Sequence, residues 1–179
     1  MTSNYYSLMI NAYEDAVGSI DSPNCDFHPE RLDRDDINIS ISDEFIYELN
    51  DGMFCHFHMA PHGINLVDSI LKDLLEKFAE KEFVEFIPVM IKSKEYGDKQ
   101  YFTVHFKKTY DVIDFVNSYC DPPGCVIRMC VDYNKVKNLH VFNSAQSLNI
   151  IVSTKVYKEI KKRKLNFGLS FGIIRCLNK

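Results

Sequence analysis

Seven apolar side chains between residues 66 and 81 recur at the spacing of one helical face, and this stripe constrains the fold most. They are Leu66, Val67, Ile70, Leu71, Leu74, Leu75 and Phe78. Charged residues fill most of the positions between them, which is the pattern of a helix with one face on a core. We therefore predict a helix over 66–81, capped by Asn65 or Asp68, whose side chains accept backbone N–H groups.

A second amphipathic helix is predicted over 154–164, after a short apolar strand at 149–152 and a capping Ser153. Further strands are predicted at 5–10, 83–91, 100–106, 126–131, 139–142 and 167–174, and 110–117 fits either a strand or a helix. In both helical regions a phenylalanine-containing strand follows the helix. These elements predict an α+β fold with a mixed, mainly antiparallel sheet and two amphipathic helices in a duplicated helix–strand arrangement.

The length of 179 residues suits a single domain over 1–179. Within it we distinguish an acidic, loop-rich N-terminal segment, 1–64, from a helix–strand core, 65–179. A chain of this size can bury a sufficient core without a disulfide or metal, so the six cysteines are expected to be free thiols. We see no secretory signal and no apolar run of about 20 residues, and therefore expect a cytoplasmic protein with no membrane partner.

The charge of the chain is unevenly distributed. Residues 1–64 contain twelve acids and two bases, which gives that segment a net charge of −10 against −4 for the whole chain. The two parts could neutralise each other within one fold, or the acids could form a face that attracts a basic partner. Under the second explanation, the candidate partner-binding residues are Glu30, Asp33, Asp35, Asp36, Asp43 and Glu44.

Three histidines and a cysteine form the most metal-like cluster of the sequence. Imidazole and thiolate are good zinc ligands. If residues 55–58 form a strand, His56 and His58 share one face and Cys55 lies opposite, so His56, His58 and His62 could ligate while Cys55 could not. The alternative, which we favour, is that these are ordinary edge-strand and turn residues. We accordingly expect no cofactor.

The predicted second helix is strongly basic. Its cations are Lys155, Lys158, Lys161, Lys162, Arg163 and Lys164. Such a run could bind nucleic acid. However, we find no RNA-binding signature and no interleaved aromatic platform. A solvated helix face, or one paired with the acidic segment, explains the run better.

One short motif matches the nucleophile elbow of hydrolases, namely Gly168-Leu169-Ser170-Phe171-Gly172. That motif requires a strand-to-helix turn and an acid and a histidine later in the chain. Only seven residues follow, and none is Asp, Glu or His. We therefore expect no catalytic residue and no enzymatic activity.

The central part of the sequence resembles a family of bacterial immunity proteins associated with polymorphic toxins, the Imm family numbered eleven, formerly a domain of unknown function. The resemblance lies in 66–69, 71–77 and 84–89, and continues through 101–104, 112–114, 140–142 and 151–153. It covers most of the chain from about Leu66 onward. These are packing and capping residues, so the resemblance provides no catalytic set, and the N-terminal third departs most from it.

The resemblance implies a non-enzymatic inhibitor that binds a cognate protein toxin and blocks its active site or another required surface. The acidic N-terminal segment would suit a basic toxin, as many nucleases are, because opposite charges accelerate encounter. Metal binding through His56, His58 and His62, and nucleic-acid binding through the basic helix, remain the alternative functions.

Overall fold

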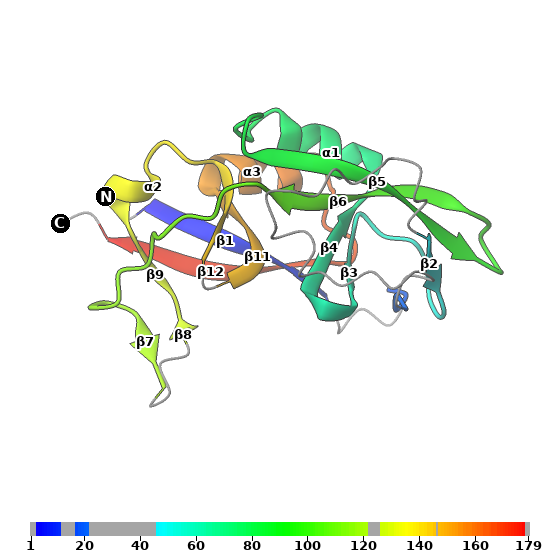
Figure 1. Cartoon of the computed structure of the whole chain (residues 1–179), viewed down its shortest axis with the longest axis horizontal. Helices are drawn as coiled ribbons and strands as arrows, with labels where there is room; N and C mark the ends of the chain where they lie inside the picture. Colours follow the sequence, from blue (N-terminus) through cyan, green and yellow to red (C-terminus); the bar gives the residue numbers. More distant parts are fainter. Residues whose placement is uncertain (1–2, 12–16, 22–45, 122–125, 146, 178–179) are drawn as a thin grey trace.

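The computed structural model describes residues 3–11, 17–21, 46–121, 126–145 and 147–177. Within these ranges the chain forms two five-stranded sheets, one two-stranded sheet and short helical segments (Figure 1). The predicted partner-binding acids at 30–44 lie outside the described residues. The structure therefore bears on the remainder of the chain.

The first sheet places the two ends of the described chain side by side. Its strand order is β10–β11–β1–β12–β9. The bounds are β1 (Ser3–Ile10), β9 (Cys130–Asp132), β10 (Val141–Ser144), β11 (Ser147–Ser153) and β12 (Leu169–Leu177). β1 is antiparallel to both β11 and β12, whereas β9 runs parallel to β12.

The second sheet has the order β2–β5–β6–β4–β3. The bounds are β2 (Ile46–Leu49), β3 (Phe57–Ala60), β4 (Ile64–Val67), β5 (Val84–Ser93) and β6 (Lys99–Phe106). β2 is parallel to β5, and the other pairs are antiparallel. Pro88 pairs with Phe102 of β6, but β2 pairs with β5 only from Met90 onward. Pro88, which cannot donate to a ladder, thus lies in the part of β5 that pairs with β6 but not with β2.

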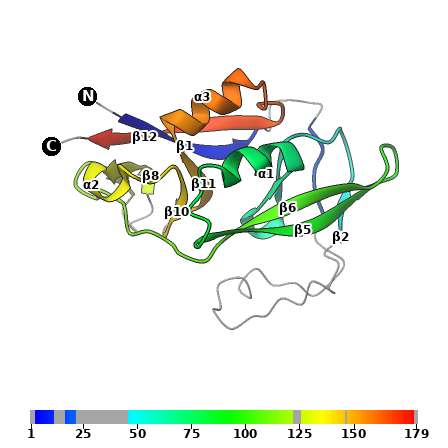
Figure 2. The same ribbon diagram turned by 90° about the horizontal axis from the view of Figure 1, so that it is seen from above.

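The smallest sheet is a hairpin of β7 (Tyr119–Cys120) and β8 (Val126–Arg128), which extends away from both larger sheets (Figure 1). The helical segments are η2 (Pro61–Gly63), α1 (Ser69–Glu76), α2 (Tyr133–Val136) and α3 (Thr154–Lys162). Figure 2 shows α1 and α3 from above, lying over the strands. Among the described residues, no helix is both long and apolar enough to cross a bilayer.

The predicted fold class is wrong. The fold is mostly β, and it is not an α+β fold built on a duplicated helix–strand arrangement in one mixed sheet. The two predicted amphipathic helices are only eight and nine residues long. The strands that flank α1 belong to the second sheet, and the strands that flank α3 belong to the first. Short strands from distant parts of the chain make up the remainder of both sheets. The sequence did not predict this arrangement, because hydrogen bonds between distant segments leave little trace in local periodicity.

The start of α1 shows why the predicted helix was too long. Leu66 and Val67 belong to β4, where they pair with Thr103 and Phe102 of β6. Both are buried, and burial suits a strand between two neighbours as well as a helical face. The helix begins only at Ser69, because Asp68, one of the two predicted caps, caps it. Oδ1 of Asp68 accepts a hydrogen bond from the Leu71 N–H at 3.0 Å.

One hydrophobic cluster joins the two large sheets. It contains buried side chains from α1 and α3 together with residues of β1, β4, β11 and β12, including Leu8, Val67, Leu75, Ile150 and Ile160. Each of these five side chains is fully buried, which is worth roughly 1.5–3 kcal/mol per side chain. The apolar faces predicted for the helices therefore do face a core, although the layers around that core differ from those predicted.

Candidate functional site

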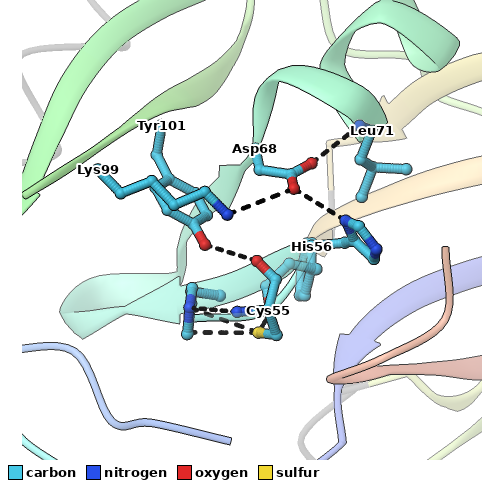
Figure 3. Close-up of polar contacts among 8 residues, drawn as sticks. Cys55, His56, Asp68, Leu71, Lys99 and Tyr101 are labelled. Carbon is cyan, nitrogen blue, oxygen red and sulfur yellow. Dashed lines mark hydrogen bonds and ion pairs between the residues drawn. The ribbon is translucent and has the colours of Figure 1, made fainter. Parts of the chain in front are cut away.

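The carboxylate of Asp68 is the centre of a polar cluster between β4 and α1 (Figure 3). Its Oδ2 lies 2.8 Å from Nδ1 of His56 and 3.7 Å from Nζ of Lys99, while Oδ1 caps α1. Burial opposes ionisation of this carboxyl, but its hydrogen bonds with His56 and the Leu71 N–H outweigh burial and lower the pKa of Asp68. Asp68 therefore carries a buried negative charge that these groups stabilise.

His58 and Cys55 form the second part of the cluster. The Cys55 N–H donates to Nε2 of His58 at 3.3 Å, and Sγ of Cys55 lies 3.4 Å from the same nitrogen. Burial lowers the pKa of His58 to about 4, against the opposing effect of a hydrogen bond to the Gly18 backbone. The imidazole is therefore neutral at pH 7, and its Nε2 serves as an acceptor.

Tyr101 of β6 connects these two parts. Its hydroxyl donates to the Cys55 carbonyl at 2.6 Å, and its ring centroid lies 5.4 Å from that of His58. The Lys99 ammonium lies 5.1 Å from the Tyr101 ring centroid, close enough for a cation–π contact. The cluster thus ties the segment before β3 to β6 and to the start of α1.

The pairing pattern argues for a structural role rather than nucleophilic catalysis. A cysteine nucleophile needs a histidine base that a third group orients. Here the acid, Asp68, pairs with His56, whereas the thiol lies against His58. Cys55 and His58 are also 3% and 0% exposed, so a substrate has no direct access to them.

The structure separates His56 from His58, two of the three histidines of the possible metal site. β3 begins at Phe57, so strand alternation does not extend back to Cys55 and His56. Contrary to the prediction, Cys55 contacts His58, and His56 turns to Asp68 instead of sharing a face with His58. Within the described ranges, no group of three or more His, Cys, Asp or Glu side chains is placed to hold a metal ion. The side chain of His62 lies outside the described part of the structure.

A different type of candidate site lies on the hairpin and the turn before it. Val116 is 86% exposed, and Tyr119, Ile127 and Phe115 are 63%, 62% and 55% exposed. Half of the eight large apolar side chains that stand exposed in the described residues are thus concentrated between 115 and 127. Such a concentration on a monomer marks an interaction site more often than a scattered apolar residue does.

The comparison with known protein families identifies the chain. Residues 44–174 match the model of the immunity protein family Imm11, which is most of the 179 residues. The chain belongs to the Imm11 immunity protein family. No curated protein matches it. The resemblance noted from Leu66 onward is confirmed, and the match begins earlier, so it includes the Cys55–His58 cluster as well as the hairpin.

Only one of the six candidate partner-binding acids, Glu44, falls within the matched residues of this Imm11 member. Glu30, Asp33, Asp35, Asp36 and Asp43 precede the match, and all six lie outside the described structure. Their role as interface charges therefore stays a prediction. The exposed hairpin, by contrast, lies entirely within the matched region. The predicted strand over 126–131 contains β8, but the sequence indicated neither β7 nor the exposure of the hairpin.

The basic helix of this Imm11 protein is α3, and its cations are exposed. Tyr157 of α3 stacks on Tyr6 of β1 with ring centroids 4.0 Å apart, and Lys161 lies 5.0 Å from the centroid of Phe171 on β12. The sequence did not reveal these rings near the cations, because strand pairing brings them together from opposite ends of the chain. Because the rings of Tyr6 and Tyr157 cover each other, they leave less free ring surface on which a nucleobase could stack.

The elbow-like motif is part of a strand, as predicted. Ser170 lies in β12, and its hydroxyl is within hydrogen-bonding distance of the Met9 and Ile10 carbonyls, at 3.3 and 3.2 Å. A nucleophile elbow requires a strand-to-helix turn that exposes the hydroxyl. The Ser170 hydroxyl instead contacts carbonyls at the end of β1, which indicates a structural role for this serine.

Proposed function

We propose that this protein binds a cognate bacterial toxin in the cytoplasm and neutralises it without catalysis. Membership of the Imm11 immunity protein family carries this proposal. The buried position of the Cys55–His58 pair and its separation from Asp68 support a non-catalytic mechanism. Inhibition would then depend on occupying a surface of the toxin, which places the functional residues on the exterior.

The proposed toxin domain has a basic surface. Residues 1–64 hold twelve acids and two bases, so they attract a cationic partner and accelerate its encounter. Glu30, Asp33, Asp35, Asp36, Asp43 and Glu44 are the interface charges in this proposal. Charge mainly affects association, and an apolar contact would provide the slow dissociation of a tight complex.

Co-expression tests the proposed function. The C-terminal domain encoded by the gene immediately upstream in the source genome is expressed with and without this protein, and growth and co-purification are followed. We expect toxicity that this protein relieves, together with a stable complex of the two chains. Toxicity without relief, or relief without a complex, would contradict neutralisation by binding.

A further inference from the structure

We propose that the toxin binds to the projecting hairpin, through a concave apolar pocket with cationic residues at its rim. The arm is defined as the turn at 114–118, β7 (Tyr119–Cys120) and β8 (Val126–Arg128). This inference rests on the proposed function and specifies the surface that carries it. It differs from the acidic segment at 30–44, which would act mainly on the rate of encounter.

The turn of the arm is held in place by Asp114. Oδ1 of Asp114 accepts hydrogen bonds from the N–H groups of Val116 and Asn117 at 3.1 and 3.3 Å, and Oδ2 accepts one from the Asn117 side chain at 2.6 Å. The backbone carbonyl of Asp114 accepts a further bond from the Ser118 N–H at 2.9 Å. Phe115 and Val116 are therefore presented on an ordered turn, so less conformational entropy is lost when a partner covers them.

The base of the arm is fastened to β9. The Cys130 N–H donates to the Ser118 hydroxyl at 2.9 Å, and the Asp114 N–H donates to the Cys130 carbonyl at 2.8 Å. Beyond this base, β7 and β8 pair only with each other in the described sheets. A two-stranded hairpin has little stability of its own, and its exposed apolar side chains gain most from a partner that surrounds it.

The charge of the arm favours a cationic pocket. From Tyr110 to Asp121 the sequence contains Asp111, Asp114 and Asp121 and no lysine or arginine, and β8 adds Arg128. Nζ of Lys135 lies 3.4 Å from Oδ2 of Asp111, so the acidic character of the arm comes from Asp114 and Asp121. An apolar projection with acids along it is complementary to a hollow with basic side chains around its opening. This matches the basic toxin surface that the acidic N-terminal segment also suits.

The shape of the arm favours a concave partner over a second copy of this chain. Stable interfaces bury about 800 Å² on each partner. Two copies meeting arm to arm would cover only one side of a narrow strip with four large apolar side chains. A pocket covers the arm on several sides and adds contacts from its own walls, so it can reach the necessary area.

Val116→Asp tests the inference, with Ile70→Asp as the matched control. Val116 is exposed enough for the change to leave the fold intact, and Ile70 is an exposed isoleucine on α1. Figure 1 shows α1 at the top of the molecule and β7 and β8 at the bottom. Affinity for the upstream-encoded C-terminal domain is measured by calorimetry, with melting temperatures to verify folding. We expect Val116→Asp to weaken binding at least about 30-fold and Ile70→Asp to change it less than about threefold.

The other outcomes separate the two proposals. If the wild-type protein binds and Val116→Asp binds equally well, or both variants lose the same affinity, the arm is not the docking surface and the proposed function stands. If the wild-type protein does not bind at all, both proposals fail. If light scattering shows a wild-type dimer that Val116→Asp converts to a monomer, the arm joins two copies of this chain and the toxin assignment is overturned.

Discussion

The Nδ1 atom of His56 lies 2.8 Å from Oδ2 of Asp68, and this contact links the segment before β3 to the first turn of α1. Asp68 is almost completely buried, and its other oxygen caps the helix. One carboxylate thus fixes the position at which β4 ends and α1 begins. Its removal should affect stability more than that of any exposed acid.

Asp68→Ala is expected to lower the free energy of unfolding by about 3 kcal/mol, because it removes a helix cap and leaves buried donors without a partner. Asp68→Asn can still cap, so it should recover about 1 kcal/mol of that loss. Urea denaturation measures both, with the exposed Asp73→Asn on α1 as control. Equal losses for Asp68→Asn and Asp68→Ala would show that the cap contributes nothing.

The buried His58 should make the protein less stable in acid. Its pKa in the folded state is about 4, below the ordinary 6.5, so the unfolded chain binds more protons between these values. Stability from His58 is therefore fully present above pH 6.5 and is lost as the pH falls toward 4, by about 3 kcal/mol in total. Urea denaturation at pH 7 and pH 5 should show a smaller difference for His58→Gln than for wild type. The same pH slope in both proteins would contradict this assignment.

Gly168 should tolerate no side chain, because it lies against Cys55. Its φ is +74°, and a Cβ there would come within 2.5 Å of Cβ and Sγ of Cys55. Gly97 has the same φ of +74° and open space around it, so it provides a matched control. We expect Gly168→Ala to cost about 3 kcal/mol and Gly97→Ala about 1 kcal/mol, as measured by denaturant unfolding. If both substitutions lowered the free energy of unfolding equally, the positive φ alone would account for the loss, and the contact with Cys55 would contribute nothing.

Replacing Asp33, Asp35 and Asp36 with Asn should slow association with the toxin by roughly tenfold at low salt and flatten its salt dependence. Stopped-flow measurements at two salt concentrations test this. The control changes three exposed acids of the described structure, namely Glu82→Gln, Glu95→Gln and Asp98→Asn, and alters the net charge equally. If both triple variants associate at the same rate, net charge rather than the acidic segment accounts for the effect.

Local sequence patterns determined several elements of this Imm11 protein. Most of the longer strands and both amphipathic helices lie close to their predicted positions, since apolar periodicity and capping residues act within a few positions of the chain. Asp68 caps α1 as predicted. Ser153 holds the N-cap position of α3, but its hydroxyl contacts His140 at 3.0 Å instead of the helix N–H groups. His140, which directly precedes β10, therefore binds the hydroxyl that was expected to cap α3.

The tertiary structure decided the fold class, the polar cluster and the arm. Residues 3–10 pair with 169–176, and Tyr101 contacts Cys55, so segments far apart in the chain come together. The alternation expected at Cys55 and His56 failed because the strand begins only at Phe57. Likewise, the sequence contains Phe115 and Val116 without indicating that they stand in solvent. Exposure depends on which surfaces other segments cover, and that is determined only when the whole chain has folded.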